Sequence, residues 1–184
     1  MWRDRQWDAG YDGTHDLSTD IAFALVGTRG MGIAPATAGN ASNVYGVVEA
    51  AFRRYAERMD GPPAPLLADY TRLCDRGDVT VLRHGRRIVG ALVSSVIGRT
   101  LEIETLAVHP AFEGRGHGAT LLEWAVDQAL EKGANAVTLY TNEVMTEAQA
   151  FWLRHGFVET GRRREDGYDR VYYRRSLLPE GAPA

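Results

Sequence analysis

The chain has 184 residues, 45% hydrophobic and 24% charged, which fits one compact domain with some additional chain. Its 21 basic and 24 acidic side chains give a net charge of −3, which argues against a nucleic-acid or anionic-membrane partner. The one cysteine, Cys74, cannot form an internal disulfide, and no apolar stretch approaches the roughly 20 residues that span a bilayer. We therefore expect a cytoplasmic protein.

The two ends of the chain differ from its middle. Residues 1–30 mix two tryptophans with Asp, Gly and Arg without a sustained period, which predicts a loosely ordered N-terminal extension. Met31 stands just before the first strand pattern, so we expect the compact domain to span residues 31–178, and Met31 is a candidate for the true start. Residues 179–184 are expected to form a frayed C-terminal tail.

Strand and helix patterns alternate along the middle of the chain. The expected strands are 33–37, 79–83, 87–95, 101–109, 136–141, 157–163 and 169–176. The expected helices are 40–59, 66–75, a long one that follows Gly118 and ends at Lys132, and 146–155. Asp166-Gly167 predicts a hairpin turn between the last two strands. This order predicts an α+β fold with a mixed, mostly antiparallel central sheet flanked by about four helices.

A glycine loop, with Gly114, Gly116 and Gly118 at alternate positions, joins a strand to the long helix. Such glycines let the backbone approach a ligand, and the loop amides with the helix N-terminus would hold an anion, most naturally a pyrophosphate. Arg115 and His117 could add positive charge. The loop lacks the Gly-Lys-Ser/Thr ending of a P-loop and lies too late in the chain for a dinucleotide fingerprint, so nucleotide hydrolysis and hydride transfer are disfavoured.

Residues from about 32 to 178 resemble the GCN5-related N-acetyltransferases. Three features carry the resemblance, in the family's order: Leu106-Ala107-Val108 followed by Pro110 is similar to the fourth strand, Gly114 to Gly118 to the acyl-CoA pyrophosphate loop, and Asn142, Ala148 and Gly156-Phe157 to the late helix and returning strand. The resemblance implies a GNAT-type fold, acetyl-CoA as cosubstrate and direct acetyl transfer to an amine.

The resemblance also implies which residues bind acetyl-CoA. The fourth strand would pair with the pantetheine arm where it splays from the fifth, the loop would hold the pyrophosphate, and Asn142 resembles a pantetheine-contacting Asn. Trp152, at the family's common tyrosine position, packs either beside the pantetheine or in the core. The expected cofactor-binding residues are Leu106, Ala107, Val108, Glu113, Gly114, Arg115, Gly116, His117, Gly118, Ala119, Asn142 and Trp152.

Two of these residues depart from the family pattern. The loop usually begins with Gln or Arg, but Glu113 stands there and brings no attraction to phosphate, although its backbone amide can still serve. Trp152 replaces the tyrosine that commonly acts as general acid. The source of a proton for the departing thiolate is then open between water, Tyr140, Tyr172 and His155.

Glu102 and Glu104 are the expected catalytic residues. They are two apart on one strand and so point to one face, unless a bulge intervenes. They match the positions of paired histidines in arylalkylamine acetyltransferases, and Glu102 also matches the catalytic glutamate of histone-type members. Neighbouring carboxylates resist ionising together, which raises the pKa of one of them. Either could take the proton that an amine with a pKa near 10.4 must lose, although one or both could instead face solvent.

Three further patterns are interpreted as structural. Arg162-Arg163-Arg164 beside acidic residues predicts a solvated hairpin rather than a phosphate or RNA site, the five histidines lack ligand spacing and predict no metal, and Cys74 is expected to be a buried small hydrophobe. The acceptor side should be formed by the first two helices and the last hairpin. Its candidate residues are Phe52, Tyr55, Glu57, Asp69, Tyr70 and Tyr172.

The leading hypothesis is an enzyme that acetylates a primary amine of a small molecule. A protein N-terminus or lysine is the alternative acceptor, which an open acidic groove would favour, whereas a closed pocket favours a small amine. A second class is a catalytically silent acyl-CoA-binding module, consistent with Glu113 and the missing tyrosine. A homodimer is compatible with the sequence.

Overall fold

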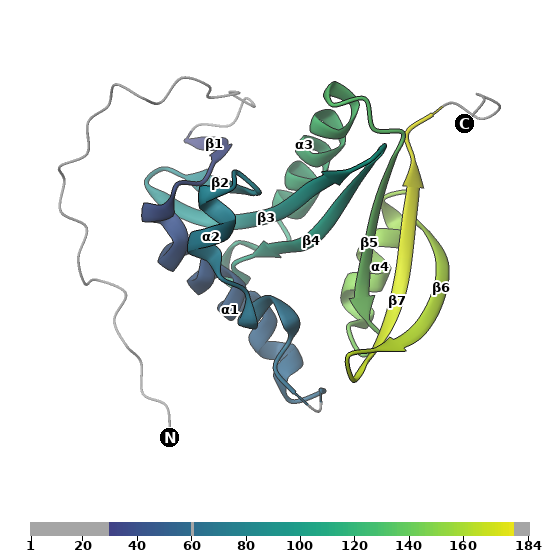
Figure 1. The fold of residues 1–184 in the computed structure, drawn as a ribbon. Helices are drawn as coiled ribbons and strands as arrows, with labels where there is room; N and C mark the ends of the chain where they lie inside the picture. Colours follow the sequence, from purple (N-terminus) through teal and green to yellow (C-terminus); the bar gives the residue numbers. More distant parts are fainter. Residues whose placement is uncertain (1–29, 60, 179–184) are drawn as a thin grey trace.

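The computed structural model describes residues 30–59 and 61–178, and within them the chain forms one seven-stranded sheet flanked by four α-helices (Figure 1). The strands are β1 Met31–Pro35, β2 Val79–His84, β3 Arg87–Ile97, β4 Thr100–Val108, β5 Ala136–Asn142, β6 Val158–Glu165 and β7 Tyr168–Ser176. The helices are α1 Ala41–Ala56, α2 Tyr70–Asp75, α3 His117–Glu131 and α4 Thr146–Arg154, with short 3-10 helices at Ala38–Asn40, Ala64–Leu67 and Pro110–Phe112.

The strand order is β1-β2-β3-β4-β5-β7-β6, and every neighbouring pair is antiparallel except β4 and β5, which are parallel. The predicted α+β fold with a mostly antiparallel sheet is therefore confirmed. The predicted extension and tail lie outside the described residues, apart from Gly30, whose carbonyl accepts a hydrogen bond of 2.6 Å from the Gly85 N–H.

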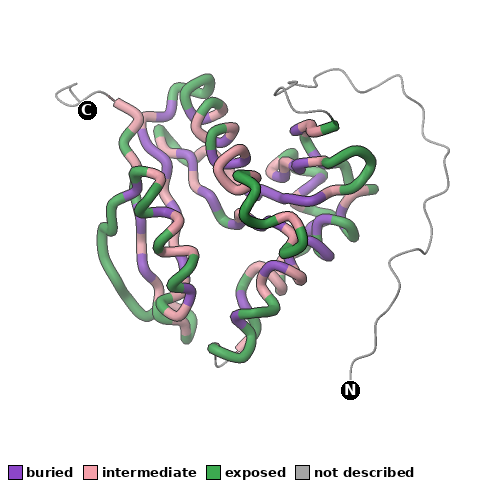
Figure 2. The backbone as a smooth tube through the Cα atoms, turned by 180° about the vertical axis from the view of Figure 1, so that it is seen from behind, coloured by how far each residue is buried: buried purple, intermediate pink, exposed green. Residues whose placement is uncertain are grey.

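Each face of the sheet carries its own hydrophobic core. Side chains of α3 and α4, among them Leu121 and Trp152, pack on one face, and side chains of α1 and α2, among them Val44 and Cys74, pack on the other. Because β3 is covered on both faces, its residues 89–93 are all buried, which an antiparallel strand with one wet face would not show (Figure 2). Cys74 is a buried core residue, as predicted.

The β6–β7 hairpin is the most exposed part of the sheet. Asp166 and Gly167 both have positive φ angles, 52° and 84°, which is the two-residue type I′ turn that the Asp-Gly pair predicts. All but the last residue of β6 are exposed. Its three arginines form ion pairs with acidic neighbours, which confirms the predicted solvated hairpin; the pairs are Arg162 with Glu143 and Glu159, Arg163 with Glu165, and Arg164 with Asp169.

The sheet opens between β4 and β5. Their pairing covers only Thr100–Ile103 against Ala136–Leu139. In the β3–β4 ladder, Val93 opposes Thr105 and Ser94 opposes Ile103, so Glu104 has no opposing residue and forms a β-bulge. A bulge bends its strand, and this one begins where the β4–β5 pairing ends. The rest of β4 therefore runs away from β5 and leaves the splayed gap that the family resemblance implies (Figure 1).

The helix expected over residues 66–75 is wrong in its first half. The chain forms a 3-10 turn at Ala64–Leu67, becomes extended at Ala68 with ψ of 145°, and starts α2 only at Tyr70. The reason is Asp69, whose carboxylate accepts a hydrogen bond of 3.0 Å from the Arg72 N–H and caps a new helix. The remaining predicted elements agree with the structure to within a few residues at each end.

Gly90 tests the close packing of α3 on β3. A Cβ built at Gly90 would lie 2.9 Å from Leu121 Cδ1 and 3.3 Å from the Ala107 carbonyl oxygen. We predict that Gly90→Ala lowers the free energy of unfolding, measured by urea denaturation, by about 1–3 kcal/mol. Gly161→Ala in β6 is the matched control, because nothing lies within 4 Å of its Cβ position. Equal stability of both variants would contradict the packing described here.

Candidate active site

The loop between β4 and α3 is open at its first two glycines. Gly114 and Gly116 have positive φ angles of 72° and 83°, a backbone conformation that favours glycine. A Cβ built at either position meets nothing within 4 Å, so no side chain fills the bend. The backbone at these two positions is therefore accessible to a ligand.

The loop amides are available to a ligand. Within residues 30–59 and 61–178, the N–H of Glu113 bonds to Pro110 and that of Thr120 to Gly116, but no carbonyl accepts from the N–H groups of residues 114–119. These groups stand at the N-terminus of α3, where the helix dipole adds a positive potential. Free backbone amides beside a helix N-terminus form an anion site, which matches a diphosphate.

Gly118 has a different role from the other two glycines. A Cβ there would lie 3.3 Å from the ring of Phe151 and 3.8 Å from Leu106, so glycine lets the first turn of α3 approach α4. The pKa of His117 is lowered by burial, with a further contribution from Arg115. His117 is therefore mostly neutral at pH 7 and offers a hydrogen bond rather than a full charge to the loop.

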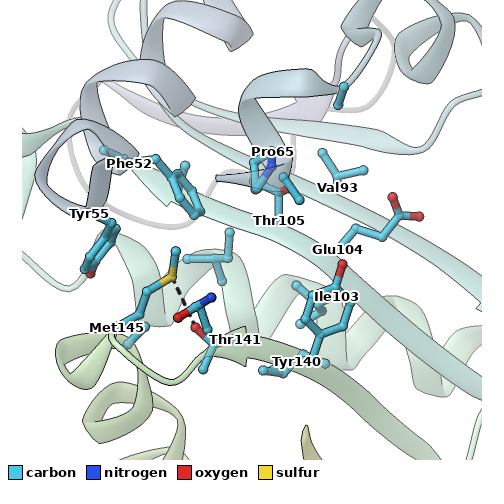
Figure 3. A pocket seen from close by; sticks show the side chains of 18 of the residues that line it. Phe52, Tyr55, Pro65, Val93, Ile103, Glu104, Thr105, Tyr140, Thr141 and Met145 are labelled. Atoms are coloured by element: carbon cyan, nitrogen blue, oxygen red, sulfur yellow. Dashed lines mark hydrogen bonds between the residues drawn. The ribbon is translucent and has the colours of Figure 1, made fainter. Parts of the chain in front are cut away.

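A cavity of about 380 Å³ lies in the gap between β4 and β5. Its walls also include the C-terminal part of α1, the segment that precedes α2, and α4 (Figure 3). The expected site residues that line it are Glu102, Glu104, Leu106, Ala107, Val108, Glu113, Asn142 and Trp152. The other expected residues, 114–119, belong to the loop and the first turn of α3 and do not line the cavity.

Glu102 and Glu104 both reach the cavity although the bulge falls at Glu104. Glu104 is exposed as a residue, but partial burial of its carboxylate raises its pKa, and the negative charges of Glu102 and Asp78 raise it further. The expected repulsion between the two glutamates is therefore present and acts on Glu104. A carboxylate with a raised pKa is a stronger proton acceptor than an ordinary surface glutamate.

Asn142 and Trp152 each combine a structural contact with a place on the cavity wall. The Asn142 side-chain oxygen accepts a hydrogen bond of 3.0 Å from the Val144 N–H and shapes the turn after β5. Trp152 is 7% exposed and packs edge-to-face on Phe157, with ring centroids 5.3 Å apart. Trp152 is thus a core residue that also forms part of the cavity wall.

Tyr140 is the proton-donor candidate that the structure places at the site. It lines the cavity on the side of Glu104 (Figure 3), whereas Tyr172 and His155 do not line it. Burial raises the pKa of Tyr140, Arg170 lowers it in part, and the negative charges of both glutamates raise it again. The pKa stays above its ordinary value, so the hydroxyl is protonated at neutral pH. The sequence could not single it out, because Tyr140 is the first β5 residue beyond the pairing with β4.

The acceptor side has aromatic walls and closing contacts. Of the residues expected there, Phe52 and Tyr55 line the cavity, and Glu57, Asp69, Tyr70 and Tyr172 do not. The hydroxyl of Tyr168, at the start of β7, donates a hydrogen bond of 2.8 Å to the Pro62 carbonyl. This bond ties the last hairpin to the segment after α1.

The last turn of α1 and the residues beyond it contact both sides of the gap. Arg54 forms an ion pair with Glu113, the first residue of the glycine loop. Arg58 forms two hydrogen bonds of 3.0 Å to the carboxylate of Glu147, at the start of α4. Neither pairing was visible in the sequence, because the partners are 59 and 89 residues apart.

In the described part of the chain, no group of three or more His, Cys, Asp or Glu side chains could hold a metal ion. Of its helices, none has both the length and the apolar character needed to cross a membrane.

This chain belongs to the acetyltransferase (GNAT) family, whose family model matches residues 45–157. It is 37% identical over 59 residues to the aminoalkylphosphonate N-acetyltransferase of Salmonella typhimurium, covering 32% of this chain and 38% of that protein. It is 36% identical over 81 residues to the mycothiol acetyltransferase of Jonesia denitrificans, covering 43% and 26%. An uncharacterised N-acetyltransferase of Mycobacterium tuberculosis is 33% identical over 89 residues, covering 48% and 57%. The matches thus span between 26% and 57% of the length of these relatives.

Solved structures of acetyltransferases share the fold. The PaiA N-acetyltransferase of Thermoplasma acidophilum, solved with coenzyme A, superposes with a TM-score of 0.68 at 16% identity over 80% of this chain and 99% of that chain. The YncA acetyltransferase of Salmonella typhimurium, solved with acetyl-CoA, superposes with a TM-score of 0.64 at 17% identity, over 84% of this chain and 98% of that chain. These similarities establish the GNAT fold for this chain.

The raised pKa of Glu104 predicts a pH-dependent stability. The folded chain binds the Glu104 proton more tightly than the unfolded chain, so this stabilisation is complete below the ordinary pKa of 4.5 and is lost as the pH rises through the folded-state value. Glu104→Gln should therefore raise the free energy of unfolding relative to the wild type near pH 7 more than near pH 4. Urea denaturation across this range measures the difference. Glu123→Gln, an exposed glutamate on α3, is the control. A Glu104→Gln difference that stays constant with pH would contradict the prediction.

Proposed function

We propose that this protein is an N-acetyltransferase that moves an acetyl group from acetyl-CoA directly to a primary amine of a small molecule. The observation that carries the proposal is the cavity beside Glu102 and Glu104, whose lining includes Glu113, the residue directly before the open amides of residues 114–119. Anion site, gap and carboxylates are the three parts that this transfer requires. The cytoplasmic location expected from the sequence belongs to the same proposal.

The residues of the gap fit acetyl-CoA. The amides of the glycine loop would hold the diphosphate. From Glu104 on, β4 has no partner on its β5 side, so the edge of residues 106–108 is free to pair with the amides of a pantetheine arm as a strand would. Asn142 and Trp152 face the same space. The bound cosubstrate supplies an acetyl group activated as a thioester.

The chain's own residues would move two protons. An acceptor amine enters as an ammonium ion with a pKa near 10.4 and must lose a proton before its nitrogen can attack. Glu102 or Glu104 takes that proton, directly or through water. Tyr140, protonated at neutral pH, stands on the same wall and donates a proton to the departing thiolate. Trp152 cannot serve in this role, because an indole is only a weak donor and does not titrate here.

The charges of the cavity favour a cationic acceptor with an apolar body. Arg54 is paired with Glu113, and Arg170 with Glu165 and Asp166, whereas Glu102 and Glu104 have no ion-pair partner among the described residues. Phe52 and Tyr55 offer an aromatic wall for the body of the amine. An acceptor that carries a phosphonate, as the name of the Salmonella relative indicates for that protein, would meet repulsion here.

The size of the cavity and one contact on its acceptor side support a small molecule over a polypeptide. The bond between Tyr168 and Pro62 joins chain segments on that side, and the cavity volume of about 380 Å³ has to hold the thioester end of acetyl-CoA as well as the acceptor. A protein N-terminus or lysine remains the alternative acceptor, because a single extended side chain could enter the same space.

Ligand binding and product release test the proposal. We expect acetyl-CoA at 100 times its dissociation constant to add about 2.7 kcal/mol to the free energy of unfolding. A panel of amines, with free CoA thiol as the readout, should then show turnover with arylalkyl and alkyl primary amines. Turnover with 2-aminoethylphosphonate should be small, and turnover with lysine peptides should be lower than with the small amines. Binding without release from any amine would indicate a silent acyl-CoA-binding module instead, and no binding would exclude both.

The carboxylates have a separate test. Replacing both Glu102 and Glu104 by Gln should lower kcat at pH 7 by about 10²- to 10⁴-fold, the usual contribution of general base catalysis. Acetyl-CoA affinity, measured by calorimetry, should stay close to the wild-type value. Glu123→Gln on α3 serves as the matched control. An unchanged kcat in the double variant would remove these residues from the mechanism, and the two single variants identify the dominant base.

A further inference from the structure

Glu113, the first residue of the glycine loop, carries a negative charge next to a site that would bind an anion. Glu113 precedes the open amides of residues 114–119, and a carboxylate there repels a diphosphate that those amides attract. This negative charge is paired with Arg54, whose guanidinium forms an ion pair with Glu113 although the two residues are 59 positions apart in the sequence. Both side chains line the cavity next to the loop.

Stability alone does not account for this pair. Arg54 and Glu113 keep 34% and 40% of their side-chain surfaces exposed, and exposed ion pairs contribute only about 0–1 kcal/mol. Arg58, one turn further on, forms a comparable exposed pair with Glu147. The two pairs differ in place: Glu147 opens α4, and Glu113 opens the loop that offers free N–H groups to an anion.

Arg54 is also held where it can reach the loop. Its helix is anchored by the buried side chains of Ala51 and Tyr55, and its guanidinium lies 6.0 Å from the centre of the Tyr55 ring. Glu113 and, at longer range, Glu147 are the acidic groups that act on it. The guanidinium presents five donors, so it can keep one bond to Glu113 and offer others to a phosphate oxygen.

We propose that Arg54 is a cofactor-binding residue that supplies from α1 the positive charge missing at the first position of the glycine loop, and that Glu113 weakens this attraction by occupying Arg54. The inference rests on the proposed function, since the anion is the diphosphate of CoA. It assigns Glu113 a definite role: its carboxylate competes with the diphosphate for the same guanidinium, which limits affinity for CoA and so favours release of the product.

Calorimetric titration of CoA into four variants tests the assignment. Arg54→Gln should weaken CoA binding about tenfold, the loss expected for a charge-assisted hydrogen bond. Glu113→Gln should tighten binding a fewfold, because Arg54 is then free for the diphosphate. The double variant should bind more weakly than Glu113→Gln. Arg58→Gln is the matched control, because Arg58 lies just beyond the end of α1 and is paired with Glu147. It should stay within about twofold of the wild type.

The same titrations with 3′-dephospho-CoA identify the phosphate. Arg54→Gln should weaken the binding of 3′-dephospho-CoA as much as that of CoA, because this ligand keeps the diphosphate. If Arg54→Gln binds 3′-dephospho-CoA as well as the wild type does, the assignment to the diphosphate is overturned. Weaker binding by Glu113→Gln would also overturn the proposal, since the pair would then only position the loop. An equal loss of CoA affinity in Arg58→Gln would overturn it too, because the effect would then come from the overall positive charge of this region and not from Arg54. Thermal melts without ligand confirm that each variant is folded, and Arg54→Lys, which retains the charge, should recover part of the affinity. If wild-type CoA binding is absent, the proposed function itself fails.

Discussion

The separation of β4 from β5 is the constraint on which the rest of the site depends. Two parallel strands pair for four residues, and a single unopposed residue, Glu104, bends one of them away. Every wall of the cavity follows from that bend, because it exposes one edge of β4, frees the end of β5 at Tyr140, and leaves room that α1 and α4 border from either side. A regular β4–β5 ladder would fill this space with its own hydrogen bonds.

The glycine loop supplies the second part of the arrangement, and Arg115 is its cationic side chain. Its N–H groups and the dipole of α3 form an anion site from backbone alone, and His117 contributes little charge because its pKa is lowered. This makes the surrounding ionised side chains important. Arg54 and Glu113 form an ion pair at this point, so α1 contributes to the electrostatics of the loop together with the loop's own Arg115.

The sequence predicted those features that depend on local chemistry. Asp166-Gly167 defined its turn because both residues tolerate positive φ, and the alternate glycines identified the loop because nothing else suits such a bend. Features set by register or by distant contacts were not predictable. The bulge at Glu104 depends on how β3 aligns with β4, and the pairing of Arg54 with Glu113 requires the whole fold. The start of α2 at Asp69 lies between these cases, because an N-cap signal was present inside the predicted helix.

The hydrogen bond between Tyr168 and Pro62 belongs to a part of the molecule that is separate from most of the cosubstrate site. Most of the parts that would bind the cosubstrate come from β4 through the start of α3, with Arg54, Asn142 and Trp152 added from α1, β5 and α4. The opposite wall is assembled from the segment after α1 and the base of the last hairpin. Substitutions in those two remote segments can therefore alter which amine is accepted without disturbing the donor machinery. Such an arrangement allows evolution to exchange acceptors on a scaffold whose chemistry stays the same.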